Sequence, residues 1–145
     1  MRVDFYQLSR DPAEAALPLI ARATLKAGER LLVVSDDEGQ RGRISDSLWG
    51  KLPDSFLAHG PAADIYADRQ PILLSDRPEP ANGARYMAIA DGRWRDADPP
   101  FERVFFMFDE QTLQPARDCW RMLGTREGLE RRFWKQQDGK WVEGP

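Results

Sequence analysis

Arg103-Val104-Phe105-Phe106-Met107-Phe108 is the most apolar run in the chain, and it decides the predicted fold. A short, continuous apolar run is typical of a strand that is buried on both faces of a sheet. A second run of this kind, Leu31-Leu32-Val33-Val34, occurs earlier in the sequence. Because segments with helical spacing separate such strands, we predict a mostly parallel sheet with the strand at 103–108 near its centre.

Helical segments with recognisable ends alternate with these strands. The first is predicted to begin with Asp11 as its N-cap and Pro12 in its first position, and to stop before Gly28. Two more helices are predicted, one at residues 40–49 and one that carries residues 117–123. Further strands are predicted at 3–8, 71–75 and 86–90.

This order of elements predicts the fold class. It is an α/β fold, with a single three-layer Rossmann-like domain over residues 1–145 and a mostly parallel sheet flanked by helices. Asp138-Gly139 separates Trp134-Lys135 from Lys140-Trp141. Residues 125–145 are therefore predicted to form a tail that is either irregular or a hairpin.

Composition narrows the class of protein. The chain has 145 residues, of which 41% are hydrophobic and 31% charged, as in a folded domain rather than a disordered one. No apolar run approaches the roughly 20 residues that span a bilayer. The N-terminus lacks the pattern of a secretory signal, and the single cysteine, Cys119, permits no intramolecular disulfide. We therefore expect a cytoplasmic protein.

The charge is unevenly distributed along the sequence. The net charge of -3 argues against general binding to nucleic acid, which depends on neutralising phosphates. Residues 117–135 nevertheless carry six basic and three acidic side chains. A basic face on an acidic protein favours a small acidic target over a long polyanion.

The sequence offers little for catalysis or for metal binding. The only histidine, His59, has no nucleophile motif beside it, so we interpret it as a packed or turn-stabilising residue. Cys119 is interpreted as a plain buried cysteine. One histidine and one cysteine cannot form a closed zinc site. We therefore predict that the protein is not an enzyme and holds no metal or other cofactor.

The strand-to-helix turns lack the features of a nucleotide site. The first turn, at residues 9–12, contains no glycine, and the chain has no Walker-type lysine. The second turn contains Asp36-Asp37-Glu38, which would repel phosphate. These carboxylates would either attract a divalent cation or form a solvated acidic turn, and we favour the solvated turn.

One stretch combines an aromatic group with two cations. In the predicted third helix Arg117, Trp120 and Arg121 stand at i, i+3 and i+4, so they share one face. Such a face suits a partner that offers an apolar group beside a carboxylate. The alternative is that Trp120 belongs to the core and that the arginines pair with Asp118 or Glu110.

Several pieces of the chain, in order, resemble one family. They are Phe5-Tyr6-Gln7-Leu8, Gly28-Glu29-Arg30-Leu31-Leu32-Val33, Leu48-Trp49, Asp54-Ser55-Phe56-Leu57-Ala58-His59-Gly60, Arg103-Val104-Phe105-Phe106, and Ala116-Arg117 with Trp120-Arg121. This set resembles the chi subunit of bacterial DNA polymerase III, an accessory protein of the clamp-loader complex. The resemblance implies an α/β fold that resembles nucleotide-binding folds and binds no nucleotide.

The resemblance also implies two protein partners. Arg117, Trp120 and Arg121 would bind the acidic C-terminal tail of single-stranded DNA-binding protein. Trp49 and Phe56 would face the psi subunit, which tethers chi to the clamp loader; the alternative is that these two side chains belong to the core. The implied function is a non-catalytic bridge in DNA replication, with contact to DNA only indirectly. The alternative is direct binding of single-stranded nucleic acid, with tryptophans as stacking platforms.

The chain departs from the family pattern at the tail-binding face. Trp120 and Arg121 stand where tyrosine and lysine are frequent, so an aromatic group and a cation are kept. Leu113 stands where some members carry a lysine. One basic contact is therefore either lost or transferred to Arg126 or Arg131.

Overall fold

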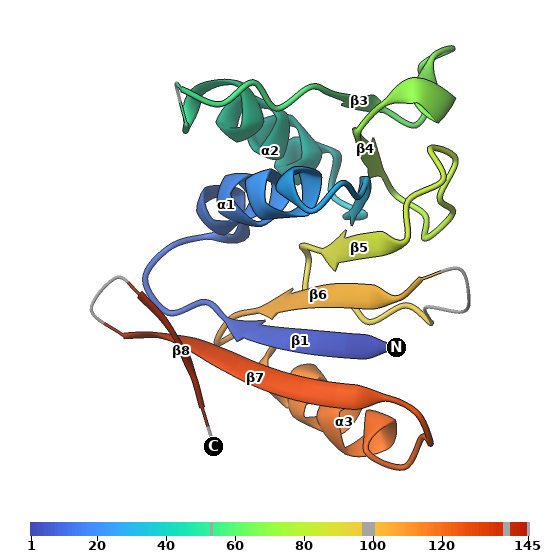
Figure 1. Cartoon of the computed structure of the whole chain (residues 1–145). Helices are drawn as coiled ribbons and strands as arrows, with labels where there is room; N and C mark the ends of the chain where they lie inside the picture. The colour runs from blue at the N-terminus through green and yellow to red at the C-terminus, as the bar shows by residue number, and fades with distance from the viewer. Residues whose placement is uncertain (53, 97–100, 138–139, 145) are drawn as a thin grey trace.

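A computed structural model describes residues 1–52, 54–96, 101–137 and 140–144. Within these residues eight strands form one sheet in the order β3-β4-β2-β5-β6-β1-β7-β8, and all neighbours are parallel except β7 and β8 (Figure 1). The strands are β1 (Arg2–Gln7), β2 (Leu31–Val34), β3 (His59–Pro61), β4 (Ile72–Ser75), β5 (Tyr86–Ile89), β6 (Arg103–Phe108), β7 (Glu130–Gln137) and β8 (Lys140–Glu143). The helices are α1 (Ala13–Lys26), α2 (Glu38–Gly50), α3 (Leu113–Leu123) and the short 3-10 helix η1 (Ala67–Arg69).

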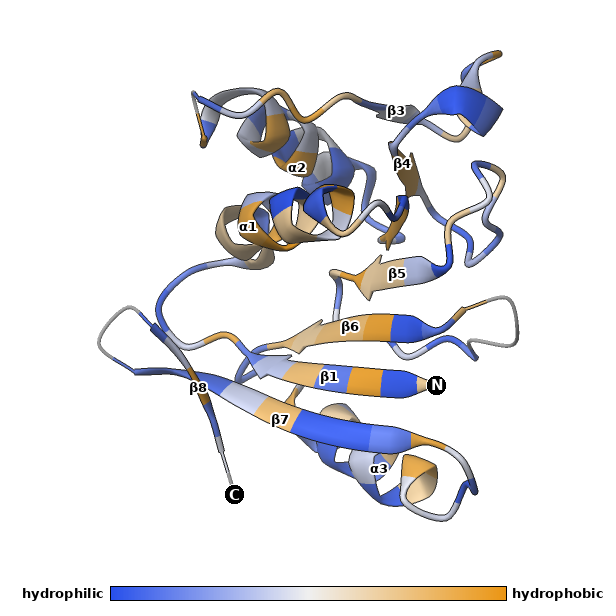
Figure 2. Cartoon of the chain, in the orientation of Figure 1, coloured by the Kyte–Doolittle hydropathy of each residue, from blue (hydrophilic) through white to orange (hydrophobic). Residues whose placement is uncertain are grey.

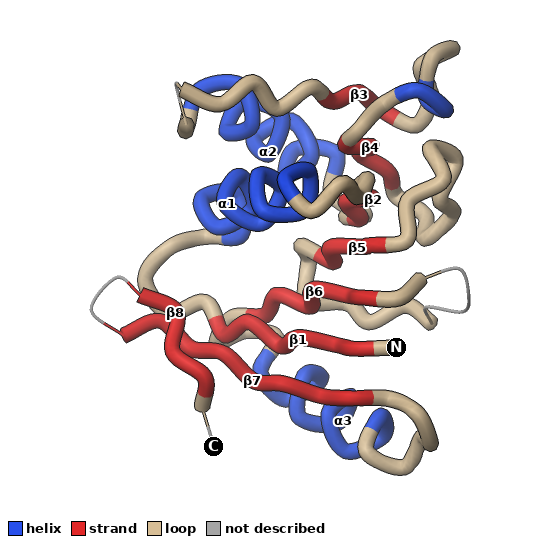
Figure 3. The backbone as a smooth tube through the Cα atoms, viewed as in Figure 1, coloured by secondary structure: helices blue, strands red, loops and turns tan. Residues whose placement is uncertain are grey.

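The helices cover the two faces of the sheet unequally. Helices α1 and α2 lie together on one face over β2 and β4, whereas α3 lies on the other face near β1 and β7 (Figures 1 and 3). Since successive side chains of a strand point to opposite faces, the apolar runs at β2 and β6 fill both cores. The predicted α/β architecture with a mostly parallel sheet is confirmed, and β6 lies inside the sheet as expected.

The strands that border α3 are more polar than the inner ones. In Figure 2 the strands β5 and β6 are largely hydrophobic, β1 alternates, and β7 is mostly hydrophilic. The alternation in β1 separates Phe5, which is buried on the α3 side, from Asp4 and Tyr6 on the other side. This difference leaves room at the β1–β7 edge for polar and aromatic side chains to meet.

Asp4 is a charged residue in the middle of this sheet, and its side chain is 0% exposed. Its carboxylate accepts hydrogen bonds from Arg2 at 2.9 Å, from Arg103 at 2.8 Å and from the indole N–H of Trp134 at 3.0 Å. The donors come from β1, β6 and β7, so the carboxylate ties three neighbouring strands together. Burial, with a further contribution from the nearby Asp4 charge, raises the pKa of Tyr6 to about 12.

The start of α1 differs from the prediction. Helix α1 begins at Ala13, with Pro12 in the N-cap position and without a side-chain cap. The predicted cap, Asp11, is engaged elsewhere, because its carboxylate accepts a hydrogen bond from the Gln136 amide at 3.0 Å. Gly28 ends the helix as predicted, in a left-handed conformation with φ of 79° that favours glycine.

The end of the chain forms a hairpin. Strand β7 pairs in parallel with β1 and antiparallel with β8, so the predicted tail is a hairpin whose first strand extends the sheet. The predicted Asp138-Gly139 turn lies outside the described residues. None of the described helices has the length and apolar character required to cross a bilayer.

Candidate functional site

Helix α3 presents the predicted basic face to a pocket. Ala116, Cys119 and Leu123 point into the core, which leaves Arg117 and Arg121 exposed and Trp120 half-buried at the boundary. The three predicted residues share one face as expected. The turn before the helix is held by Asp109, whose carboxylate accepts hydrogen bonds from the backbone N–H groups of residues 111 and 112 at 3.0 and 3.1 Å.

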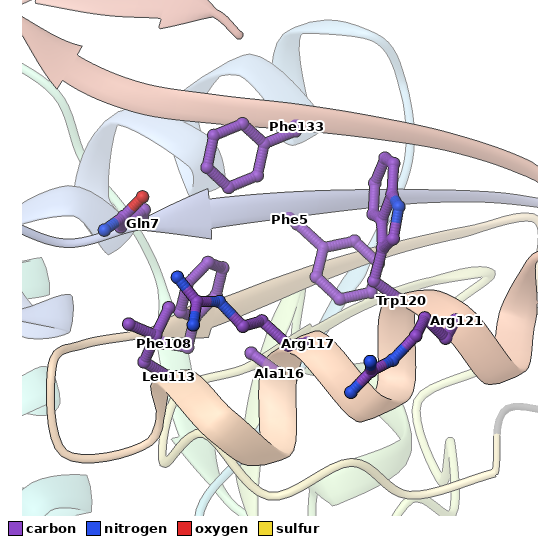
Figure 4. A pocket seen from close by; sticks show the side chains of 9 residues that line it. All are labelled: Phe5, Gln7, Phe108, Leu113, Ala116, Arg117, Trp120, Arg121 and Phe133. Carbon is purple, nitrogen blue, oxygen red and sulfur yellow. The ribbon is translucent and has the colours of Figure 1, made fainter. Parts of the chain in front are cut away.

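The pocket is a cavity of about 440 Å³ between α3 and the strands β1, β6 and β7 (Figure 4). Its lining residues are Phe5, Gln7, Phe108, Leu113, Ala116, Arg117, Trp120, Arg121 and Phe133. All three residues of the predicted tail-binding face therefore line a single cavity.

Four aromatic rings, Phe5, Phe108, Trp120 and Phe133, line this pocket and together form an aromatic box. The ring centroids of Phe5 and Trp120 are 5.1 Å apart, and those of Trp120 and Phe133 are 6.4 Å apart. Phe133 lies 6.2 Å from Phe108, which in turn lies 6.3 Å from Phe5. Phe5 and Phe108 are buried and form the floor, while Trp120 and Phe133 are half-buried walls. Such a box can receive a further ring in an edge-to-face arrangement.

The two arginines of the pocket differ in their pairing. Arg121 forms an ion pair with Asp118 at 2.5 Å, but both side chains are largely exposed, at 69% and 62%. Exposed pairs contribute about 0–1 kcal/mol, so a ligand carboxylate can replace Asp118 at little cost. Arg117 forms no ion pair with any residue in the described ranges. Of the alternative, the pairing of Arg121 with Asp118 is present and the half-buried indole of Trp120 packs against the core, but Arg117 is not neutralised by a described residue.

The two residues expected to replace a lost basic contact lie elsewhere. Arg126 pairs with Asp96 at 3.2 Å, and Arg131 donates a hydrogen bond to the backbone carbonyl of Trp120 at 2.6 Å. Leu113 lines the pocket with an apolar side chain at the position where some relatives carry lysine. The cations that line this cavity are therefore Arg117 and Arg121.

The predicted psi-facing residues form a second surface at the other end of the sheet. Trp49 on α2 is 54% exposed and Phe56 is 80% exposed, with their ring centroids 5.9 Å apart. Helix α2 lies over β3 and β4, whereas α3 lies near β1 and β7, so the two surfaces are well separated (Figure 1). The sequence offered no means of deciding between core and surface for this pair, and the structure places both rings at the surface.

His59 packs against the Trp49 ring of this aromatic pair. Its ring centroid is 4.5 Å from that of Trp49. Its Nε2 lies 2.8 Å from the Ser45 hydroxyl and its Nδ1 lies 2.8 Å from the carbonyl of Leu57. Both ring nitrogens are thus engaged in local hydrogen bonds, as in the packed histidine that we predicted.

The acidic turn after β2 is structural. Asp37 accepts a hydrogen bond from the backbone N–H of Gln40 at the start of α2, and Asp36 pairs with Arg95 at 2.9 Å. The side-chain hydrogen bond from Arg95 holds the pKa of Asp36 below its ordinary value. In the described part of the chain, no group of three His, Cys, Asp or Glu residues is arranged to hold a metal ion.

Asp91 completes the charge network at this edge of the sheet. Partial burial works to raise its pKa, but hydrogen bonds from Arg95 and from the backbone N–H of Asp36 hold that pKa below its ordinary value. Cys119 is on the buried side of α3, and burial raises the pKa of its thiol to about 12. The prediction of a plain buried cysteine is therefore confirmed.

The fold and the pocket define a small α/β domain with an aromatic and basic surface cavity, and comparison with protein families agrees with the resemblance seen in the sequence. The family model of the DNA polymerase III chi subunit, HolC, matches residues 1–130. The chain therefore belongs to this family, and its role is that of an accessory protein of DNA polymerase III in DNA replication. A comparison with curated proteins finds no match.

Part of the pocket could not be predicted from the sequence. Phe5 and Phe133 become neighbours because β1 and β7 pair in parallel with these two residues in register. Phe108 lies across from Gln7 on the other side of β1. The order of strands in the sheet brings these residues together, and no local pattern signals that order.

Proposed function

We propose that this chi-family protein is a non-catalytic bridge of the clamp loader. It binds the acidic C-terminal tail of single-stranded DNA-binding protein through Arg117, Trp120 and Arg121, and it binds the psi subunit through Trp49 and Phe56. The observation that carries the proposal is the aromatic box with two exposed arginines at its rim. Cytoplasmic location follows from the same role.

The ligand that fits the cavity is a mobile peptide that ends in phenylalanine with a free carboxylate and carries aspartates before it. Its ring enters the box and packs against the indole of Trp120. Its terminal carboxylate is held by Arg117 or Arg121, whose guanidinium groups can bind a carboxylate through two parallel hydrogen bonds. The preceding aspartates are attracted by the same basic face.

The expected affinity for a single tail is weak. Ordering a mobile peptide is costly, and few contacts hold it, so we expect a dissociation constant on the order of micromolar that rises with salt. Many tails on coated DNA raise the effective concentration and maintain the attachment. Weak single contacts then allow release while the protein stays near the DNA.

The separation of the two surfaces supports a bridging role. Trp49 belongs to α2 and its ring lies 5.9 Å from that of Phe56, whereas the pocket is lined by residues of α3. Helices α2 and α3 lie at opposite ends of the sheet (Figure 1). Exposed aromatic side chains grouped in this way favour a covering protein partner. A psi subunit bound at one end leaves the pocket at the other end open to a tail.

Direct binding of single-stranded nucleic acid has less support. The indoles of Trp134 and Trp141 pack against Tyr6, with centroids 6.3 and 5.0 Å away, so they are already engaged within the domain. Arg132 in the same strand pairs with Glu130 at 3.1 Å, which reduces the local basic charge. Titration with dT oligonucleotides tests this alternative, and tight, salt-dependent binding would favour it over the tail.

Calorimetry with a tail peptide tests the proposed function. The wild-type protein should bind the full peptide and should lose binding when its last phenylalanine is deleted. Trp120→Ala and Arg117→Ala should each weaken binding by at least about 1 kcal/mol, as for contact residues at the centre of an interface. Equal affinity for the full and the truncated peptide would show that the last phenylalanine does not bind in the pocket, and would contradict the proposed function.

A further inference from the structure

Strand β7 builds one side of the pocket, although the family match ends at residue 130, the first residue of that strand. Two of its later side chains, Arg131 and Phe133, contact Trp120. Residues beyond the matched segment therefore contribute to the site, and their roles must be argued from the structure itself.

Arg131 contacts Trp120 twice, once over its indole ring and once at its backbone carbonyl. Its guanidinium carbon lies 4.2 Å from the centroid of the indole ring, which is the geometry of a cation–π interaction. Its Nη1 also donates a hydrogen bond of 2.6 Å to the backbone carbonyl of the same residue. The indole thus has Arg131 over its ring and Phe5 at 5.1 Å in an edge-to-face contact. Arg131 does not line the cavity, so it acts on the ligand through Trp120.

Gly124 provides the space in which Arg131 crosses the end of α3. A Cβ atom at this position would lie 2.8 Å from Nη1 and 2.9 Å from Cζ of Arg131, which is too close for either atom to stay in place. The backbone of Gly124 has φ of -65°, which any residue adopts, so what the glycine provides here is space for the end of the Arg131 side chain. An alanine would displace the guanidinium and remove no functional group.

Phe133 is the neighbouring wall of the box and is also fixed in place. Its ring lies 6.2 Å from Phe108 and 6.4 Å from Trp120. Gly144, which follows β8, donates a backbone hydrogen bond of 2.8 Å to the Phe133 carbonyl, and a Cβ at Gly144 would lie 2.6 Å from the ring. The hairpin therefore packs behind this ring and limits its movement.

We propose that strand β7 gives the pocket its preference for an aromatic last residue. Arg131 is a positioning residue that fixes the orientation of Trp120, and Phe133 is a specificity-determining ring that packs edge to face against Trp120 and lines the same pocket. The preference rests on the proposed function, since it concerns the peptide bound there. Two rings held in fixed orientations favour a planar ligand ring, because aromatic pairs depend on geometry.

The test compares two tail peptides that differ only in the last residue, phenylalanine or leucine, by calorimetry. The wild-type protein should bind the phenylalanine peptide about fivefold more tightly. Arg131→Ala and Gly124→Ala should each reduce this ratio toward one. The double variant should show no further reduction, because both changes remove the same contact. Phe133→Leu should reduce the ratio as well, by removing the second ring.

Arg132→Ala is the matched control. It removes the same charge from the next residue of β7, on the opposite face of the sheet, and should leave the ratio unchanged. Thermal unfolding of each variant shows that it is folded. An unchanged ratio in folded Arg131→Ala and Gly124→Ala would overturn the inference, as would an equal reduction in Arg132→Ala.

A second measurement separates this inference from the proposed function. The indole N–H resonance of Trp120, assigned by comparison with Trp120→Phe, should shift in the same direction in Arg131→Ala and in Gly124→Ala without any peptide. A wild-type protein that binds neither peptide would defeat the proposed function, and the positioning role would then be decided by this resonance. An unmoved resonance in both variants would overturn the positioning role.

Discussion

Replacement of Asp4 by asparagine should destabilise the protein strongly. The carboxylate is fully buried and accepts four hydrogen bonds, two from Arg2 and one each from Arg103 and Trp134. Loss of one partner of a buried charged group costs about 3–5 kcal/mol. The two arginines are 27% and 28% exposed, so water can partly replace the lost carboxylate. We therefore expect the lower end of that range, about 3 kcal/mol.

Urea denaturation followed by circular dichroism measures this loss. The transition midpoint should fall with an unchanged slope, because the same surface is exposed on unfolding. The melting temperature should fall by roughly 6–12 °C, at about 2–4 °C per kcal/mol for a chain of this size. Asp118→Asn, which removes an exposed ion-pair partner, is the control and should change stability by less than about 1 kcal/mol. A loss of less than about 1 kcal/mol in Asp4→Asn would refute the reasoning.

Three other predictions concern separate parts of the molecule. Because the pKa of Asp91 is lowered by folding, its contribution to stability is present above the unfolded pKa of about 3.9 and is lost as pH falls through the folded value. The difference in melting temperature between the wild type and Asp91→Asn should therefore shrink below about pH 4, and a difference that grows there would contradict the sign. Cys119 is buried with a thiol pKa raised to about 12, so iodoacetamide at pH 8 should modify it slowly in native protein and rapidly in urea; equal rates would show an accessible thiol. Trp49→Ala and Phe56→Ala should each change stability by less than about 1 kcal/mol and should abolish capture of a psi subunit. A large loss of stability would show that these two side chains belong to the core.

Local patterns in the sequence predicted the elements of the fold well. The apolar runs predicted β2 and β6, and the spacing of Arg117, Trp120 and Arg121 predicted that they share one face of α3. These features depend on residues close in the chain, so a single sequence contains them.

Contacts between residues that are far apart in the chain could not be predicted from the sequence. The polar strand β7 has no apolar alternation that marks it as a neighbour of β1, and the contact of Phe133 with Trp120 depends on that pairing. Asp4 stands in a strand pattern as an ordinary polar residue, and only the parallel neighbours reveal its buried partners. The prediction that Asp11 caps the first helix was wrong for the same reason. The Asp11 carboxylate accepts a hydrogen bond from Gln136, a residue near the far end of the chain.

The most direct test of the central claim is an NMR measurement on the protein bound to a tail peptide with a labelled terminal phenylalanine. Intermolecular nuclear Overhauser effects should connect the phenylalanine ring with Trp120 and Phe133. The resonances of the Arg117 or the Arg121 guanidinium should shift on binding, because the peptide carboxylate lies beside one of them. Contacts of that ring with Trp49 and Phe56, or with Trp134 and Trp141, and none with Trp120, would contradict the account.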